Sequence, residues 1–120
     1  PNFSGYVDER GEGEGAGSNL NLPLEPPVDD ERYLGVLDRA LAAIHRFNPD
    51  ILVVSLGFDI MRGDPTGSFA VSQQGMGRIG RRIGRFGRPT LVVQEGGYSV
   101  GNLRVGARSF FEALASAWYE

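Results

Sequence analysis

An aspartate and a tyrosine each follow a short apolar segment of this chain. Asp59 comes shortly after the run at 51–55, and Tyr98 comes shortly after the run at 90–94. In an open parallel sheet, ligands bind beyond the carboxyl ends of the strands, so polar residues after two such strands are expected to share one pocket. A phenol in that pocket can donate a hydrogen bond to an oxyanion. Asp59 and Tyr98 are therefore the candidate functional residues.

Each of these two residues also has a structural interpretation. A carboxylate at a strand end is often a helix cap or a partner for backbone amides, and a tyrosine after a turn often packs with its hydroxyl in water. The flanking glycines favour function, because Gly57 and Gly63 bracket Asp59, and Gly96-Gly97 precedes Tyr98. Paired glycines suit a backbone that takes unusual dihedral angles or lets a ligand approach closely.

Two loops accompany these residues. Segment 56–67 is predicted to be a shaped loop, in which Asp64-Pro65 signals a turn and the Asp64 carboxylate bonds to backbone amides of the same loop. Region 1–18 is rich in glycine and acids and is predicted to be a loop laid over a rigid body. Phosphate or dinucleotide binding by this second loop is disfavoured, because it carries Glu12 and Glu14 and leads into a predicted strand instead of following one.

Three segments have the patterns of strands. Residues 19–24 alternate polar and apolar side chains, which is typical of a strand with one buried face, and Pro23 places that strand at an edge. The runs at 51–55 and 90–94 are continuously apolar, as expected of strands covered on both faces.

Three helices are predicted to alternate with these strands. Acids at 29–31 open the first helix, which should end at 47–48, before Pro49. Ser72 can cap a second helix that ends near Gly87, and Asn102 begins a third. Strands that alternate with helices imply right-handed crossovers. The predicted class is therefore α/β, with a three-layer αβα arrangement around a parallel sheet.

The second predicted helix has two distinct faces. Gly77, Gly80 and Gly84 share one stripe, and each costs ~1 kcal/mol relative to alanine, so this stripe is expected to allow close backbone packing against a neighbour. The opposite face is cationic and could bind an anion, although a solvated face is the favoured interpretation. Its members are Arg78, Arg81, Arg82 and Arg85.

Composition excludes several classes of partner. The 120 residues are 41% hydrophobic and 22% charged, which fits one globular domain or part of one. Twelve arginines against fifteen acids give a net charge of -3, so neither nucleic acid nor an anionic membrane is an expected partner. The sequence has no cysteine, which leaves the redox compartment open. It has no apolar run of membrane-spanning length and no leader pattern, and we expect a cytoplasmic protein. The start at Pro1 indicates a fragment.

An ordered set of motifs resembles the zinc-dependent deacetylases of the arginase/deacetylase fold. This family includes histone deacetylases and acetylpolyamine amidohydrolases. Each motif alone is weak, but together they run the length of the chain in the family's order, at 11–15, 19–24, 54–59, 63–65 and 95–98. The residues at 6–13 and the glutamate at Glu95 resemble the acetylpolyamine amidohydrolase branch most.

The resemblance implies roles for four residues. Asp59 matches the family's second carboxylate ligand of zinc, and Tyr98 matches the tyrosine that hydrogen-bonds the substrate carbonyl. Gly97 would border the tunnel that admits an acylated amine, and Phe3 matches an aromatic wall of that tunnel. Zinc with open positions polarises an amide carbonyl and lowers the pKa of a bound water toward ~7, and Tyr98 would stabilise the oxyanion. The implied substrates are acetylated polyamines or acetyl-lysine-like amines.

The resemblance also implies that the active site is incomplete. The family's paired histidines and Asp-x-His zinc ligands belong to an N-terminal part that nothing here matches. His45 lies near the end of the first predicted helix, without a second histidine or an acid placed to share a metal with it. Residues 1–120 therefore correspond to the C-terminal segment of one deacetylase-like domain, with 1–18 as a glycine-rich active-site loop region, and should be inactive alone.

Two further expectations follow from an incomplete domain. Strand edges and apolar helix faces that lack their cover favour a homo-oligomer, unless the missing N-terminal portion completes the domain. The rival to the enzyme hypothesis is a non-catalytic α/β fragment that acts as an interaction or remnant domain, in which Asp59 and Tyr98 serve only packing and turn structure.

Overall fold

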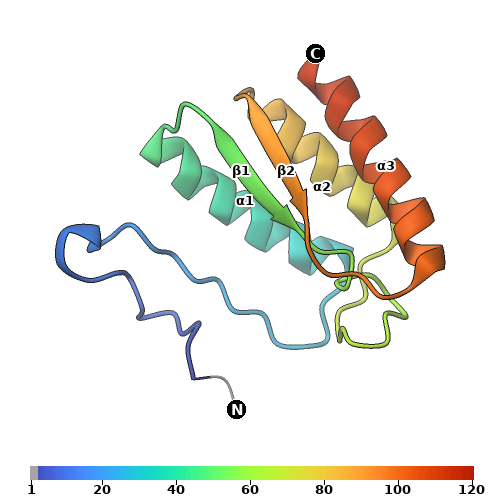
Figure 1. Cartoon of the computed structure of the whole chain (residues 1–120), viewed down its shortest axis with the longest axis horizontal. Coiled ribbons are helices and arrows are strands. Elements are labelled where there is room, and N and C mark those ends of the chain that lie inside the picture. Colours follow the sequence, from blue (N-terminus) through green and yellow to red (C-terminus); the bar gives the residue numbers. More distant parts are fainter. Residues whose placement is uncertain (1–2) are drawn as a thin grey trace.

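The structure, a computed structural model, describes residues 3–120 as a parallel pair of strands with three helices (Figure 1). The helices are α1 (Asp30–Phe47), α2 (Gln73–Arg85) and α3 (Val100–Trp118), the strands are β1 (Leu52–Leu56) and β2 (Thr90–Gln94), and a short 3-10 helix, η1, spans Gly13–Gly15. β1 and β2 pair in parallel, with Leu52 opposite Thr90 and Leu56 opposite Gln94. The α/β class and the parallel sheet are confirmed.

A polar side chain caps the start of each α-helix. These caps accept hydrogen bonds from backbone amides three positions on: Asp29 from Arg32, Ser72 from Gly75, and Ser99 from Asn102. Asn48, in the left-handed region with φ 58°, ends α1 as predicted. The predicted start of the third helix at Asn102 is wrong, because Ser99 supplies the cap and α3 begins at Val100.

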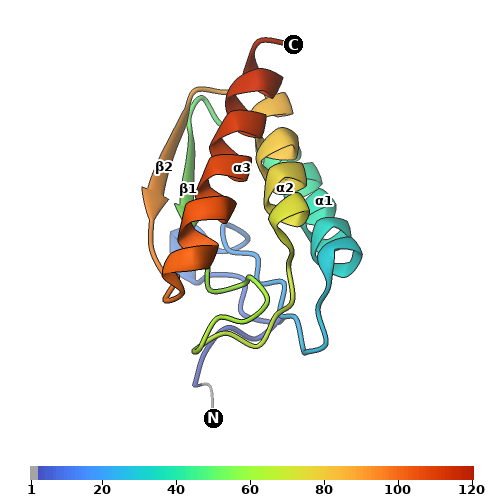
Figure 2. The same ribbon diagram turned by 90° about the vertical axis from the view of Figure 1, so that its right-hand side faces the viewer.

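All three helices lie on one face of the sheet (Figure 2). Leu52 and Leu56 on that face are buried, whereas Val53 and Leu91 on the other face are 61% and 57% exposed. Residues 3–120 thus supply two layers, and the expectation that these strands are covered on both faces is not met within them. A continuously apolar strand is expected to be covered on both faces, but its sequence does not show whether the residues that cover the second face belong to the same segment.

The predicted strand at 19–24 is wrong. These residues form no strand, and no sheet partner for them exists among residues 3–120. Side chains here instead bond to the loop that precedes them: Asn19 Nδ2 donates to the Glu9 carbonyl oxygen at 2.6 Å, and Asn21 Nδ2 donates to the Tyr6 carbonyl oxygen at 2.8 Å. The alternation of polar and apolar residues reflects these bonds rather than a ladder.

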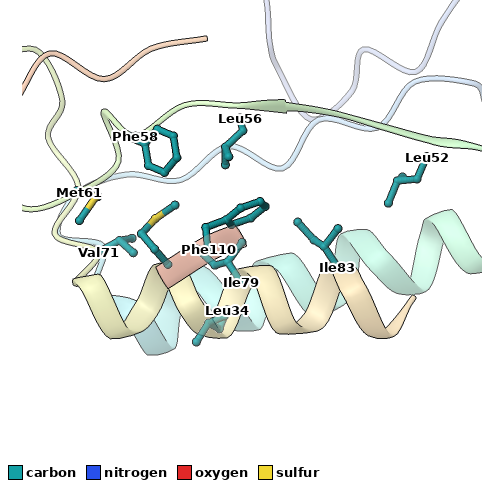
Figure 3. Packing of buried hydrophobic residues seen from close by; sticks show 10 residues of the cluster. Leu34, Leu52, Leu56, Phe58, Met61, Val71, Ile79, Ile83 and Phe110 are labelled. Carbon is teal, nitrogen blue, oxygen red and sulfur yellow. The ribbon is translucent and has the colours of Figure 1, made fainter. Parts of the chain in front are cut away.

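The core lies between the sheet and the helices (Figure 3). Phe58, Met61 and Val71, from the connection between β1 and α2, meet Phe110 of α3 and Leu34 of α1 in one buried cluster. Phe110 and Phe111 also contact edge to face, with ring centroids 5.1 Å apart. The loop that follows β1 is therefore anchored in the core at both of its ends.

No helix of the described part of the chain is long and apolar enough to cross a membrane.

The glycine stripe of α2 lies against the backbone of α3, as predicted. A Cβ at Gly80 would overlap the Phe110 carbonyl oxygen, and one at Gly84 would lie 2.5 Å from the Leu114 carbonyl oxygen. Only glycine lets the two helices approach this closely.

Replacing Gly80 with alanine should destabilise the protein by about 1–2 kcal/mol. Alanine favours the helix by ~1 kcal/mol, but the overlap with a backbone oxygen forces α2 and α3 apart, and overpacking of this kind costs ~1–3 kcal/mol or more. Urea unfolding measures the difference. Gly35→Ala is the matched control, because a Cβ at Gly35 of α1 meets open space and should be neutral or stabilising. Equal effects of the two substitutions would contradict the packing argument.

The cationic face of α2 forms ion pairs with its neighbours. Arg78 pairs with Glu31 and Arg82 with Asp38, both on α1, while Arg81 and Arg85 pair with Glu120. The favoured interpretation of a solvated face is therefore incomplete, since these side chains bridge elements. Solvent screens exposed pairs of this type, so each contributes little to stability.

Candidate active site

The loops after β1 and β2 lie side by side and extend the pairing of the strands. Glu95 N donates to the Leu56 carbonyl oxygen at 2.8 Å, and Phe58 N donates to the Gly96 carbonyl oxygen at 2.8 Å. Phe58 is 2% exposed and belongs to the core cluster, so the residue beside it, Asp59, has a fixed backbone. Asp59 therefore lies beside the loop at 95–98, whereas the predicted pocket shared by Asp59 and Tyr98 stays a prediction.

The Asp59 carboxylate occupies a notch between two glycines. A Cβ at Gly57 would overlap Asp59 Oδ1, and a Cβ at Gly96 would overlap Oδ2. Within residues 3–120 this carboxylate makes no hydrogen bond and no salt bridge. A half-buried carboxylate held in a tight notch, with no protein partner in this part of the chain, has its oxygens available to a ligand.

Gly97 turns the second loop so that Tyr98 follows at the surface. Its φ of 129° is in the region that favours glycine, and a Cβ here would lie 2.9 Å from Phe58 Cβ and 3.0 Å from Leu103 Cδ2. Gly97 therefore packs the second loop directly onto the first. Tyr98 is 62% exposed, so residues 3–120 form no closed pocket around its ring.

The Asp64 carboxylate is buried and accepts four hydrogen bonds. Oδ1 accepts from Thr66 N at 2.8 Å, Thr66 Oγ1 at 2.9 Å and Gly67 N at 3.1 Å, and Oδ2 accepts from Tyr98 N at 2.8 Å. Burial raises the pKa of Asp64, but the bonds from Tyr98, Thr66 and Gly67 outweigh burial and lower the pKa from 3.8 to about 2. The predicted structural role in its own loop is confirmed, and the bond to Tyr98 is additional.

This lowered pKa predicts how stability depends on pH. The folded pKa of Asp64, about 2, lies below its ordinary value of 3.8, so ionised Asp64 stabilises the fold above pH 3.8 and loses this contribution as the pH falls toward 2. The free energy of unfolding of the wild type, relative to Asp64→Asn, should be constant from pH 7 down to that window and then shrink. A difference that grows on acidification would contradict the assignment.

Tyr33 of α1 lies close enough to feel the charge of Asp59. Burial, and after it the negative charge of Asp59, raise the pKa of the Tyr33 phenol. Its ring contacts Phe69 edge to face, with centroids 6.4 Å apart. This phenol therefore stays protonated at neutral pH.

Comparison with known proteins identifies the family. The sequence matches the histone deacetylase domain over residues 1–114, which is nearly the whole chain. The chain belongs to the histone deacetylase domain family. An acetylpolyamine amidohydrolase of Burkholderia pseudomallei (strain 1710b) is 48% identical over 111 residues, which are 92% of this chain and 33% of that protein. Acetylpolyamine amidohydrolase 1 of Pseudomonas aeruginosa is 40% identical over 117 residues, 98% of this chain and 34% of that protein.

A solved structure of this family also superimposes on the chain. The crystal structure of an acetylpolyamine aminohydrolase from Burkholderia pseudomallei matches with a TM-score of 0.92 and 45% sequence identity, over 96% of this chain and 34% of that chain. The arginase/deacetylase-like fold expected from the motifs is thereby confirmed. The chain spans about a third of the length of these relatives.

No complete metal site lies within the described residues of this histone deacetylase domain segment. Residues 3–120 contain no group of three or more His, Cys, Asp or Glu side chains that could share a metal ion. The Asp59 carboxylate, held in the notch between Gly57 and Gly96, is an oxygen donor of the kind that binds divalent ions such as zinc. Any ion on Asp59 would need its remaining ligands from outside these residues.

Phe3 is the most exposed large hydrophobic residue among the predicted site residues. Its ring is 93% exposed, so no described residue packs against it closely enough to fix a tunnel wall. The loop that follows Phe3 has its own internal hydrogen bonds: Glu9 Oε2 accepts from Gly5 N at 2.5 Å and from Tyr6 N at 2.7 Å.

A groove of about 570 Å³ lies between residues 17–22 and α1, and it includes neither Asp59 nor Tyr98.

Proposed function

We propose that this chain supplies one metal ligand, Asp59, and one oxyanion-stabilising phenol, Tyr98, to a zinc-dependent amidohydrolase that removes acetyl groups from amines. The observation that carries the proposal is the Asp59 carboxylate, which has no protein partner within residues 3–120 and touches the loop of Tyr98 through Gly96. Family membership supports the reaction class, and relatives named acetylpolyamine amidohydrolases support the substrate class.

Each residue has a distinct part in this reaction. Zinc, when bound, polarises an acetyl carbonyl and acidifies a water. Asp59 would supply one oxygen ligand to the ion, and its negative charge would offset part of the ion's charge. Tyr98 donates a hydrogen bond to the carbonyl oxygen as that oxygen gains negative charge. Gly97, which has no side chain, lets the acyl group pass close to the backbone, and Phe3 is proposed to form one wall of the passage.

The substrate is proposed to be an acetylated polyamine or an acetyl-lysine-like amine. The acetyl carbonyl is proposed to lie at the surface next to Asp59 and Tyr98, and the amine portion to extend away from the metal. Because Tyr98 is 62% exposed in this segment, the rest of the polypeptide must cover it to exclude water from the reacting carbonyl. The same missing portion, or a second copy of the chain, is proposed to cover the bare face of the sheet.

Removal of zinc should abolish hydrolysis by the full-length protein. The assay follows release of acetate from acetylputrescine and from an acetyl-lysine peptide, before and after dialysis against a chelator and after zinc is restored. We expect hydrolysis of at least one substrate, its loss with the metal and its recovery with zinc. Residues 1–120 alone serve as the control and should be inactive. Hydrolysis that survives complete metal removal, or no hydrolysis of either substrate by the zinc-loaded protein, would contradict the proposal.

A further inference from the structure

The two oxygens of the Asp64 carboxylate serve two different loops. Oδ1 accepts all of its hydrogen bonds from Thr66 and Gly67, which lie in the same turn as Asp64. Oδ2 accepts from the backbone amide of Tyr98 at 2.8 Å, across 34 positions of sequence. A turn that needed only internal support would use Oδ1 alone. The bond from Oδ2 is thus the feature that an ordinary turn does not explain.

The Asp64 turn is packed against the backbone of Asp59. A Cβ at Gly67 would overlap the Asp59 carbonyl oxygen and would lie 3.6 Å from Asp64 Cβ. Asp64 itself is 7% exposed and cannot move into solvent without breaking four bonds. The carboxylate that holds the Tyr98 amide is therefore part of the same rigid unit as the residue proposed to bind the metal.

Two other hydrogen bonds, one before and one after Tyr98 in the sequence, also join these segments, and neither of them involves the Tyr98 amide. Phe58 N donates to the Gly96 carbonyl oxygen, and this bond fixes the second loop at Gly96, two positions before Tyr98. Gly97 then turns with φ 129°, and Asn102 Nδ2 donates to the Arg62 carbonyl oxygen at 3.0 Å beyond it. Between these two hydrogen bonds, the bond that Tyr98 N donates to Asp64 sets the direction of the backbone at Tyr98.

We propose that Asp64 is a positioning residue that holds the Tyr98 phenol at a fixed place relative to the Asp59 carboxylate. The inference rests on the proposed function, because the place of the phenol matters only if it contacts the reacting carbonyl. Displacement of a catalytic group by about 1 Å can lower the rate by ~10²-fold. Asp64 thus contributes to the rate through Tyr98, without contacting the substrate or the metal.

A double-mutant cycle in the full-length, zinc-loaded protein tests this inference. The cycle compares wild type, Asp64→Asn, Tyr98→Phe and the double variant, and kcat, KM and zinc content are measured for each. Asparagine keeps the shape of Asp64, and its single carbonyl oxygen can serve the turn, but its amide nitrogen then faces the Tyr98 N–H and cannot accept. Thr66→Val is the matched control, because it removes one bond to Oδ1 and leaves the bond to Tyr98 intact.

We expect Asp64→Asn to lower kcat by ~10²-fold, with KM and zinc content nearly unchanged, and Thr66→Val to have little effect. In the Tyr98→Phe background, Asp64→Asn should lower kcat no further, because the group that it positions is already gone. An equal loss in both backgrounds, or a kcat that Asp64→Asn does not change, would overturn the inference. If Tyr98→Phe itself leaves kcat unchanged, the proposed function fails first.

A second measurement applies even if Asp64→Asn does not fold. Amide hydrogen exchange in the wild-type protein should show the Tyr98 amide protected by ~10-fold or more relative to an unstructured peptide, because its hydrogen bond must break before it exchanges. Exchange at the unstructured rate would show that no such bond holds Tyr98, and would overturn the inference independently of any variant.

Discussion

Asp59→Asn should reduce both zinc content and deacetylation of the full-length protein to near background. Loss of a residue that merely orients a metal ligand weakens metal binding by ~10–100-fold, so loss of a ligand should exceed ~100-fold. Asparagine keeps the shape that fits between Gly57 and Gly96, but it removes the charge and replaces one of the two oxygens with an amide nitrogen. Zinc content by elemental analysis and kcat/KM for acetylputrescine are the measurements.

Asp50→Asn is the control for this substitution. Asp50 undergoes the same chemical change, is exposed, and precedes β1 at the end of the strand opposite to Asp59. It should leave zinc content and kcat/KM unchanged. If Asp59→Asn retains full zinc and full activity, Asp59 is not a ligand and the proposed function loses the observation that carries it.

Tyr98→Phe should lower kcat by ~10²–10³-fold while zinc content and thermal stability stay the same. Removal of one oxyanion donor has an effect of this size in other hydrolases. The substitution removes only a hydroxyl from a ring that is 62% exposed, and it keeps the backbone amide that bonds to Asp64. The fold should therefore be unaffected.

Tyr119→Phe makes the same chemical change at a neutral position. Tyr119 lies just after α3 and is 87% exposed. Its substitution should leave kcat unchanged. A Tyr98→Phe variant with full kcat would exclude an oxyanion role for this phenol, and a variant that loses zinc or unfolds would assign Tyr98 to structure instead.

The meeting of Asp59 with the loop of Tyr98 could be predicted from sequence because parallel strands end at one edge of a sheet. Two apolar runs separated by a helix imply such a pair, and the residues that follow each run must then be neighbours. The close contact of α2 with α3 was also predictable, since a row of glycines weakens a helix unless a neighbouring backbone packs closely against it.

The strand at 19–24 could not be excluded from sequence. Alternation indicates which side chains are covered, but it does not indicate what the backbone bonds to. In the structure, Asn19 and Asn21 bond to the loop at 6–9, and side-chain amides of this kind compete with ladder formation.

The bond from Asp64 to Tyr98 could not be predicted either. Every residue except proline carries a backbone amide, so no residue type at 98 marks it as the partner of a carboxylate 34 positions earlier. The Gly-Asp-Pro sequence predicts a turn and the bonds within it. Which second loop that turn contacts depends on how the two strands pair, and this is visible only in three dimensions.

A crystal structure of the full-length protein with zinc and a hydroxamate inhibitor would test the joint roles of Asp59 and Tyr98 in a single measurement. We predict one Asp59 oxygen at ~2.0–2.2 Å from zinc, with the Tyr98 hydroxyl within ~2.6–3.2 Å of the inhibitor oxygen that zinc binds. Zinc held by ligands that do not include Asp59, or a Tyr98 ring turned away from the inhibitor, would contradict these roles.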